Sequence, residues 1–267
     1  MNKRFFVSVA LLLGLAGAAP AQTRRAAYGL QVWPELQAEL ALPGRDYLLL
    51  TVRGQQNTDN NNDRHVPNRV LGFDERRATV AYEHFLGERW SVGGTLGYVS
   101  ANKNYTLMPE VLLRHRSPVG PLMFGQRLSL ERTFPSQPGA TGQTNARLRA
   151  DLEQEFPVGR FALRPRLSYE AVSRVRLLRS NTDPDERTIQ FTSLRGEVGC
   201  RLGPSFDVTP WLAYQSNYFF ALEQSGPMGT IPASRLNVVY PVLGLDLRFT
   251  LLQGQDAAAR QQLPTQH

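Results

Sequence analysis

The sequence predicts an all-β protein: an antiparallel up-and-down transmembrane β-barrel of about ten to twelve strands, with twelve preferred. Two observations favour this class. Segments of roughly ten residues alternate apolar and polar side chains and are separated by turn residues, as barrel strands are. The polar positions are largely charged, so each strand has one apolar face and one face of ion-forming groups.

Short and long connections separate the segments, as in bacterial outer-membrane barrels, which have tight periplasmic turns and longer outer loops. About ten residues also suffice for a tilted strand to cross the hydrocarbon of a bilayer. In chain order the predicted strands are 28–42, 46–55, 75–86, 89–100, 106–116, 122–134, 145–156, 161–178, 188–202, 206–222 and 235–252.

The segment 145–156, NARLRADLEQEF, also has features of a helix. Leu148, Leu152 and Phe156 recur every four residues, and most of its residues are good helix formers. Its apolar residues up to Leu152 nevertheless alternate strictly with charged and amide side chains. A lone helix among strands would have no face to pack on, so we predict a strand.

The cost of placing charge in lipid decides which face points inward. One arginine facing lipid at the bilayer midplane costs roughly 2–4 kcal/mol, and a typical domain has a net stability of only about 5–15 kcal/mol. The charged face must therefore line the interior. The residues predicted to line the lumen are Arg114, Arg127, Glu131, Arg147, Arg149, Asp151, Glu153, Arg164, Arg166, Glu170, Arg195, Glu197 and Arg201.

The strand count and two prolines do not fit this scheme directly. Single-chain bacterial barrels have an even number of strands, so eleven segments imply a missed, invented or misassigned strand. Pro34 and Pro241 lie inside predicted strands, where a closed barrel has no edge for them. Around Pro241 the alternation changes phase, because Leu236 and Val238 point one way and Leu243 the other. We expect bulges at both prolines.

The ends of the chain carry two further predicted regions. Residues 1–21 have a basic start, the apolar run 5–17 and small residues before Gln22, which predicts a cleaved secretory signal peptide rather than a single membrane anchor. The barrel is expected over 22–252, and 253–267 is predicted to be a disordered polar tail.

The net charge and the single cysteine further limit the possible partners and cross-links of the protein. The chain has 30 Lys and Arg against 23 Asp and Glu and a pI of about 9.9. With a signal peptide and inward arginines, this excess indicates a lumen or a lipopolysaccharide surface and argues against nucleic acid. Cys200 is the only cysteine, so no internal disulfide is expected.

The order of segments resembles a family of uncharacterised bacterial outer-membrane β-barrels known only as a domain of unknown function. The resemblance rests on VWPELQAEL leading to LLLTVRGQ, on ERRATVAYEHFLGERWSVGGTLGY, on the pair RLSLERTF and ARLRADLEQEF, and on the closing GLDLRF. It covers about residues 28–250. The resemblance implies a barrel and brings no established activity.

Candidate catalytic and metal-binding residues are few. His84 and His115 fall on the predicted lipid-facing side, and His115 with Ser117 is the nearest approach to a hydrolytic pair. The acidic loop runs 59–63 and 183–186 lack EF-hand spacing. We therefore predict no catalytic site, metal or cofactor.

Three functional hypotheses remain open. The favoured one is a monomeric outer-membrane barrel in contact with membrane lipid and lipopolysaccharide, either plugged by interior ion pairs or forming a narrow small-solute channel. The alternatives are an outer-membrane lipid-modifying hydrolase using His84 or His115, and a secreted soluble β-sandwich.

Overall fold

The computed structural model describes residues 24–42, 46–58, 72–101, 103–159, 161–175, 188–203, 205–221, 224–226, 229–231 and 234–252. The predicted signal peptide (1–21), the predicted tail (253–267) and the acidic runs 59–63 and 183–186 lie outside these residues. Within the described part, no helix is both long and apolar enough to cross a membrane.

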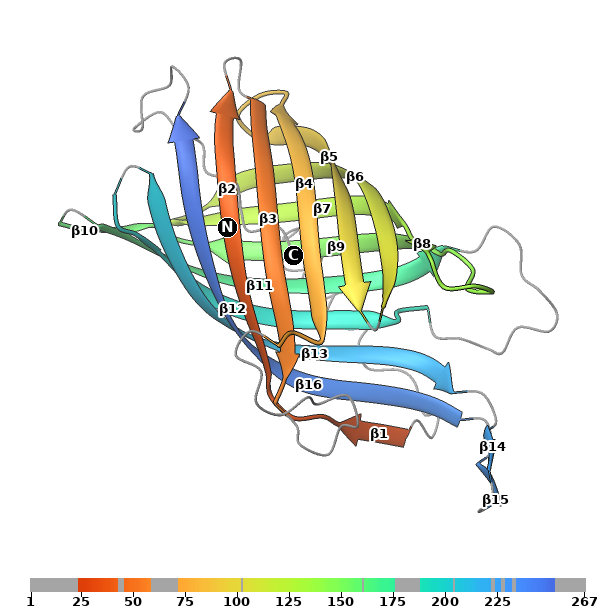
Figure 1. Cartoon of the computed structure of the whole chain (residues 1–267). Coiled ribbons are helices and arrows are strands. Elements are labelled where there is room, and N and C mark those ends of the chain that lie inside the picture. Colours follow the sequence, from red (N-terminus) through yellow and green to blue (C-terminus); the bar gives the residue numbers. More distant parts are fainter. Residues whose placement is uncertain are drawn as a thin grey trace, which may run out of the picture.

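The main sheet curls into a closed barrel (Figure 1), which confirms the predicted all-β barrel class. Neighbouring strands in the chain pair antiparallel around the ring. The strands of the ring are β2 (Gln31–Leu42), β3 (Asp46–Asn57), β4 (Glu75–Phe85), β5 (Trp90–Ala101), β6 (Asn104–Val119), β7 (Leu122–Arg132), β9 (Thr144–Glu153), β11 (Phe161–Val175), β12 (Phe191–Arg201), β13 (Phe206–Ala221) and β16 (Ser234–Leu252).

The ring has eleven strands, within the predicted range but not the preferred twelve. It closes because β16 pairs with β2 in parallel, from Val242 opposite Gln31 to Leu252 opposite Ala41. When an odd number of strands alternate in direction, the first and last must run the same way. The even-number rule failed here because the sequence pattern gives no information on how the two end strands meet.

The bulge expected at Pro241 is absent. The β13–β16 ladder runs without a break through Pro241, which lies opposite Tyr214, and Val238 and Val242 on either side of Pro241 are both buried. The apparent change of phase arises because β16 has apolar residues on its inner face before the proline and on its outer face after it.

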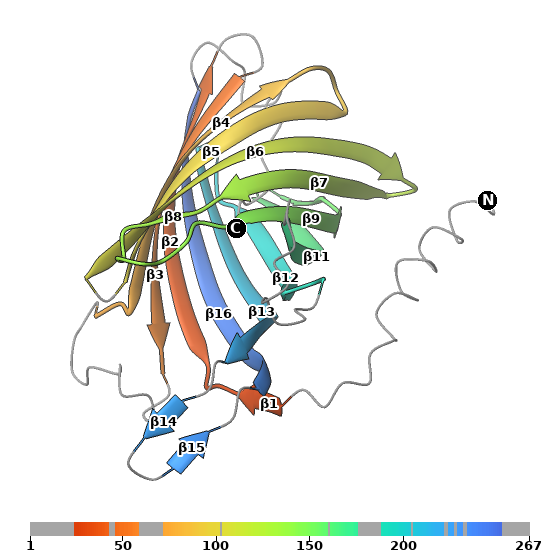
Figure 2. The same cartoon turned by 90° about the vertical axis from the view of Figure 1, so that its right-hand side faces the viewer.

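The segment between β1 and β2, which lies opposite Pro241, contains one extra residue instead. The short strand β1 (Arg24–Ala27) pairs in parallel with β16 up to Val239, and β2 resumes at Gln31 opposite Val242. Residues 28–30 therefore lie opposite 240–241, three against two. Figure 2 shows β1 beside β16. Since proline has no N–H to give to a ladder, an interruption here leaves fewer backbone groups unmatched.

Pro34 likewise causes no change of register. Val32 lies opposite Gln56 and Glu35 opposite Arg53, so the same offset holds on both sides of the proline. The expected bulge at Pro34 is wrong. The ring of Pro34 is exposed on the outer surface of the barrel.

The two ends of the barrel differ. Five connections (β2–β3, β4–β5, β6–β7, β9–β11 and β12–β13) lie at what we call the short-turn end. The tightest joins Val119 to Leu122 through Gly120 and Pro121. Gly120 has φ 62°, as the first central position of a type II′ hairpin turn requires. The opposite, long-loop end holds the start of β2, four longer connections and the short connection from Ala101 to Asn104.

Small strands accompany the ring. The hairpin of β14 and β15 forms a separate sheet after β13, and two other pieces extend ring strands. These elements are β8 (Phe134–Pro135), β10 (Phe156–Val158), β14 (Gln224–Gly226) and β15 (Gly229–Ile231).

Side-chain exposure is inverted relative to a water-soluble domain. Large apolar residues on the outer face, such as Leu128 and Leu212, are more than half exposed, at 53% and 58%. On the inner face charged residues such as Arg114 and Glu197 are buried. The soluble β-sandwich alternative is wrong, because one closed sheet surrounds a charged interior in place of two sheets around an apolar one.

Gly244 provides a test of the packing at the β13–β16 pair. A Cβ added there would lie 1.9 Å from Cε2 of Trp211, so Gly244→Ala must displace the indole. We expect a loss of about 1–3 kcal/mol in the free energy of unfolding, as for other overpacked cores, measured by urea titration in detergent micelles. Gly196→Ala is the control, because nothing lies within 4 Å of the added carbon. Equal unfolding midpoints for the two variants would contradict the packing described here.

Candidate functional site: the interior of the barrel

All thirteen residues predicted to line the lumen lie on the inner phase of their strands. Nine are buried and four are partly buried. The buried ones are Arg114, Arg127, Glu131, Arg149, Asp151, Arg164, Arg166, Arg195 and Glu197. The partly buried ones are Arg147, Glu153, Glu170 and Arg201.

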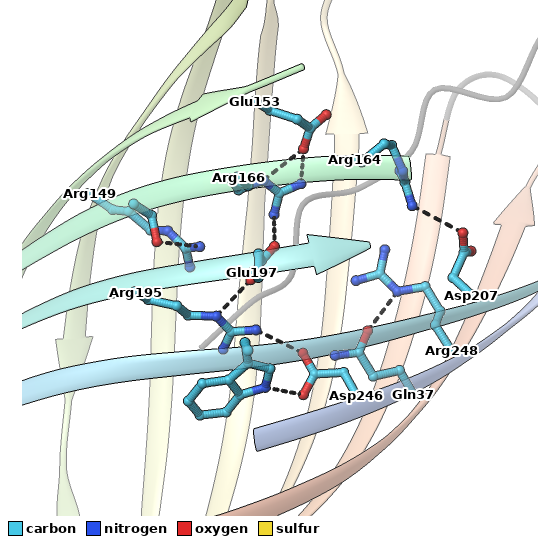
Figure 3. A network of polar contacts seen from close by, with 12 residues as sticks. Gln37, Arg149, Glu153, Arg164, Arg166, Arg195, Glu197, Asp207, Asp246 and Arg248 are labelled. Carbon is cyan, nitrogen blue, oxygen red and sulfur yellow. Dashed lines mark hydrogen bonds and ion pairs between the residues drawn. The ribbon is translucent and has the colours of Figure 1, made fainter. Parts of the chain in front are cut away.

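Five charged side chains, four of them from the predicted set, form a continuous chain of ion pairs across strands β9, β11, β12 and β16 (Figure 3). Glu153 accepts hydrogen bonds from Arg166, and Nη1 of Arg166 donates to Oε1 of Glu197 at 2.8 Å. Nε of Arg195 donates to the other oxygen of Glu197 at 2.6 Å, and its Nη2 to Asp246 at 2.9 Å. Each carboxylate lies between cationic or polar donors, which is the condition for burying such charges.

Two tryptophans extend this chain into a stack of rings and guanidinium groups. Nε1 of Trp211 donates to Asp246 at 2.7 Å, and the guanidinium of Arg195 lies 3.9 Å from the Trp211 ring centroid. Trp33 meets Trp211 edge-on with centroids 5.9 Å apart, and Arg53 lies over Trp33 at 4.6 Å. Cation–π contacts of this kind gain strength when desolvated, so the stack fixes the two arginines across the seam between β2 and β16.

Further ion pairs fill the short-turn half of the barrel. Arg114 and Glu83 lie 2.5 Å apart with side chains 5% and 1% exposed, and Ser91 also donates to Glu83. On the opposite wall Arg248 donates to Gln37 at 2.6 Å and to Glu39 at 3.3 Å. Other pairs of this kind are Arg164–Asp207, Arg116–Glu153 and Arg201–Asp207, and the pair Arg127–Glu110 lies between the two halves, against the second cavity described below.

The predicted residues nearer the long-loop end are held more openly. Arg147 pairs with Glu131 at 3.0 Å and with Glu170 at 3.1 Å. Arg149 donates to the hydroxyl of Ser168 at 3.4 Å. Asp151 lies nearer the short-turn end, where it packs over Gly125, and a Cβ added to that glycine would lie 2.6 Å from Oδ2 of Asp151. Gly125 thus provides the space that this carboxylate occupies.

A cavity of about 360 Å³, which we call the vestibule, lies in the long-loop half. Its charged lining consists of Arg53, Arg77, Arg147, Arg149, Arg195, Glu75 and Glu170. A second cavity of about 50 Å³, the inner pocket, shares Arg53, Arg77 and Arg147 with the vestibule and adds Arg127. The barrel is therefore packed with ion pairs at one end and hollow at the other.

Several interior groups were not among the predicted lumen residues. Glu35 and Glu39 on β2, Asp207 on β13, and Asp246 and Arg248 on β16 are all buried inside. The alternation in QVWPELQAELAL and GLDLRF carried the signal. It was obscured by uncertainty over the phase of the two proline-containing strands.

The candidate hydrolase residues do not form a nucleophile–base pair. Nδ1 of His84 lies 2.5 Å from Oδ1 of Asp46, and the His115 ring packs on Trp90 with centroids 4.5 Å apart. Within the described chain neither histidine hydrogen-bonds a serine hydroxyl. The described residues also contain no cluster of His, Cys, Asp and Glu suited to a metal ion.

Comparison with known proteins finds similarity in shape to solved structures. No protein-family model matches the chain, and no curated protein matches it either. The chain is similar to the structure described as "NanC porin structure in rhombohedral crystal form", with 11% sequence identity and a TM-score of 0.40. The similarity covers 68% of this chain and 78% of that one.

Glu197 holds two buried arginines and is the sharpest test of the ion-pair chain. Glu197→Ala would leave Arg166 and Arg195 without their shared carboxylate. Breaking a buried pair in this way costs about 3–5 kcal/mol, and we expect a loss of that size in urea unfolding in micelles. Glu155→Ala, which removes an exposed carboxylate, should have no measurable effect. If both variants unfold at the wild-type midpoint, the chain is not stabilising.

Proposed function

We propose that this chain is a bacterial outer-membrane β-barrel that provides a narrow, Arg- and Glu-lined path for small solutes. The observation that carries the proposal is the inverted distribution of side chains, with apolar residues outside and charged residues inside. In water such an exterior would be a large exposed apolar patch, whereas in lipid it is the favourable surface. The predicted signal peptide supports export.

The size of the ring supports a narrow path. Barrels of about eight strands are filled by side chains, and those with 16–18 enclose a water channel. Eleven strands lie between, and the ion pairs of the short-turn half occupy much of the section there. The excess of arginine along the lumen favours anions over cations.

The proposed surroundings follow from the same surface. Lipid and lipopolysaccharide contact the apolar exterior, and the chain is a monomer, because a closed ring leaves no long strand edge for a second copy to pair with. The resemblance to the uncharacterised outer-membrane family agrees with this location and stays a prediction.

Location in the outer membrane is tested by fractionation and gel mobility. We expect the folded protein to require detergent for extraction. We also expect it to migrate differently before and after boiling in SDS, because a closed barrel keeps its backbone hydrogen bonds in the detergent. Recovery in the periplasmic fraction without detergent would contradict the proposal.

Conduction is tested in planar bilayers with a variant that widens the lumen. The wild type should show small single-channel conductance steps. Under a salt gradient its reversal potential should shift toward the equilibrium potential of the anion. In Glu83→Ala combined with Arg114→Ala the steps should grow, since removing both partners clears space without leaving a buried unpaired charge. Arg76→Ala combined with Glu155→Ala is the matched control, because both residues are exposed. A complete lack of steps in every protein would leave a purely structural barrel.

A further inference from the structure

The vestibule has the size and lining of a ligand site. Small-molecule sites are concave and commonly measure about 300–1,000 Å³, and the vestibule measures about 360 Å³. Its walls come from strands far apart in sequence, from β2 to β16. A bound molecule would therefore be surrounded by rigid strands, which hold recognition groups more precisely than loops do.

The vestibule carries a positive charge. Among the described residues, five arginines and two glutamates line it, a formal excess of three positive charges. Arg147 and Arg195 are each held between carboxylates, and Arg53 pairs with Glu35 at 3.9 Å, so neighbouring carboxylates balance these three arginines. The charge that is left includes that of Arg77 and favours an anionic ligand.

Arg77 lines the vestibule without a carboxylate partner among the described residues. Nη2 of Arg77 lies 4.0 Å from the sulfur of Met108, which is a weak acceptor. Its Nε is buried and makes no hydrogen bond. Among the described residues no carboxylate lies within ion-pair distance of Arg77. The Arg77 side chain is partly buried, and removing a cation from water without a partner is unfavourable, so an anion beside it would stabilise this region.

The inner pocket extends the same site. Arg77 and Arg127 both line it. Three carboxylates also line it, and each is paired with an arginine other than Arg77: Glu35 with Arg53, Glu110 with Arg127 and Glu131 with Arg147. Arg127 gives Nη2 to Glu110 at 2.5 Å, but its Nε and Nη1 make no hydrogen bond among the described residues. A space of about 50 Å³ accommodates a carboxylate, since one water molecule takes up about 30 Å³ in the liquid. The carboxylate of a ligand would fit between the two guanidinium groups.

The rest of the vestibule suits hydroxyl groups. Six side-chain amides line it: Gln55, Gln143, Asn145, Gln190, Gln215 and Asn217. An amide both donates and accepts hydrogen bonds and can therefore match a hydroxyl in either role. Oε1 of Gln215 is buried and makes no hydrogen bond within the described chain. The Trp33 and Tyr240 rings add apolar faces to the same wall.

We propose that the vestibule binds a small polyhydroxylated organic acid, with its carboxylate at Arg77 and its hydroxyl groups at the ring of amides. This assignment deepens the proposed function by naming the solute class. Binding in micelles requires neither conduction nor a membrane, so it can succeed or fail independently of the bilayer experiment.

Calorimetric titration of the full chain in detergent micelles tests the assignment, with glucuronate as probe. Glucose has the same ring without the charge, and propionate has the charge without the hydroxyls. We expect glucuronate to bind, and glucose and propionate to bind at least about tenfold more weakly. Glucose lacks the charge-assisted hydrogen bonds of the carboxylate, and propionate lacks the hydrogen bonds of the hydroxyl groups. Propionate binding as tightly as glucuronate would overturn the hydroxyl recognition, and glucose binding as tightly would overturn the role of charge.

Substitution of Arg77 tests the placement of the carboxylate. Arg77→Gln should weaken glucuronate binding by about tenfold or more, and Arg77→Lys should retain part of it, since lysine keeps the charge but loses the planar fork. Arg76→Gln is the matched control: it makes the same change on the neighbouring, outward-facing residue and should bind as the wild type does. A change in gel mobility between unboiled and boiled samples in SDS shows whether each variant is folded. If folded Arg77→Gln binds like Arg76→Gln, or if the wild type does not bind glucuronate, the assignment is wrong.

Discussion

The guanidinium and carboxylate groups inside the barrel have to neutralise one another, and much of the architecture follows from that requirement. On the lipid-facing exterior that we propose, each arginine would cost roughly 2–4 kcal/mol, and most long charged side chains of the ring strands turn inward. There they are tolerated only when paired. The chain from Glu153 to Asp246 meets this condition by giving Arg166, Glu197 and Arg195 partners on both sides.

The parallel pairing of β2 and β16 that closes the ring is a second constraint on the fold. Several irregular features lie along this seam. β2 and β16 each contain a proline, and Pro34 lies opposite Leu245 in their shared ladder. The extra residue among 28–30 lies next to the same seam, opposite Pro241. The Trp33–Trp211 contact packs across it from inside. Side-chain packing thus reinforces a part of the ring in which two prolines provide no backbone donor.

Local alternation was sufficient to predict most strands and the direction of their faces. It identified 145–156 as a strand despite its helix-forming residues, and β9 spans Thr144–Glu153. What it could not supply was non-local. Whether the first and last strands meet in parallel depends on their pairing alone, which no local pattern encodes, so the even-number rule misled. The hollow of the vestibule depends on how side chains from many strands meet, which strand phase alone does not determine.

The contrast between the two halves of the barrel bears on how any solute would pass. In the long-loop half the arginines outnumber the carboxylates among the described residues around the vestibule, which favours an anionic over a cationic solute there. In the short-turn half Arg114, Arg164 and Arg248 are closely paired and buried. Moving one member of such a pair leaves the other charge uncompensated. An incoming anion can pair with the arginine, but the displaced carboxylate then lacks its partner, so the short-turn half is the costlier part of the path for any solute.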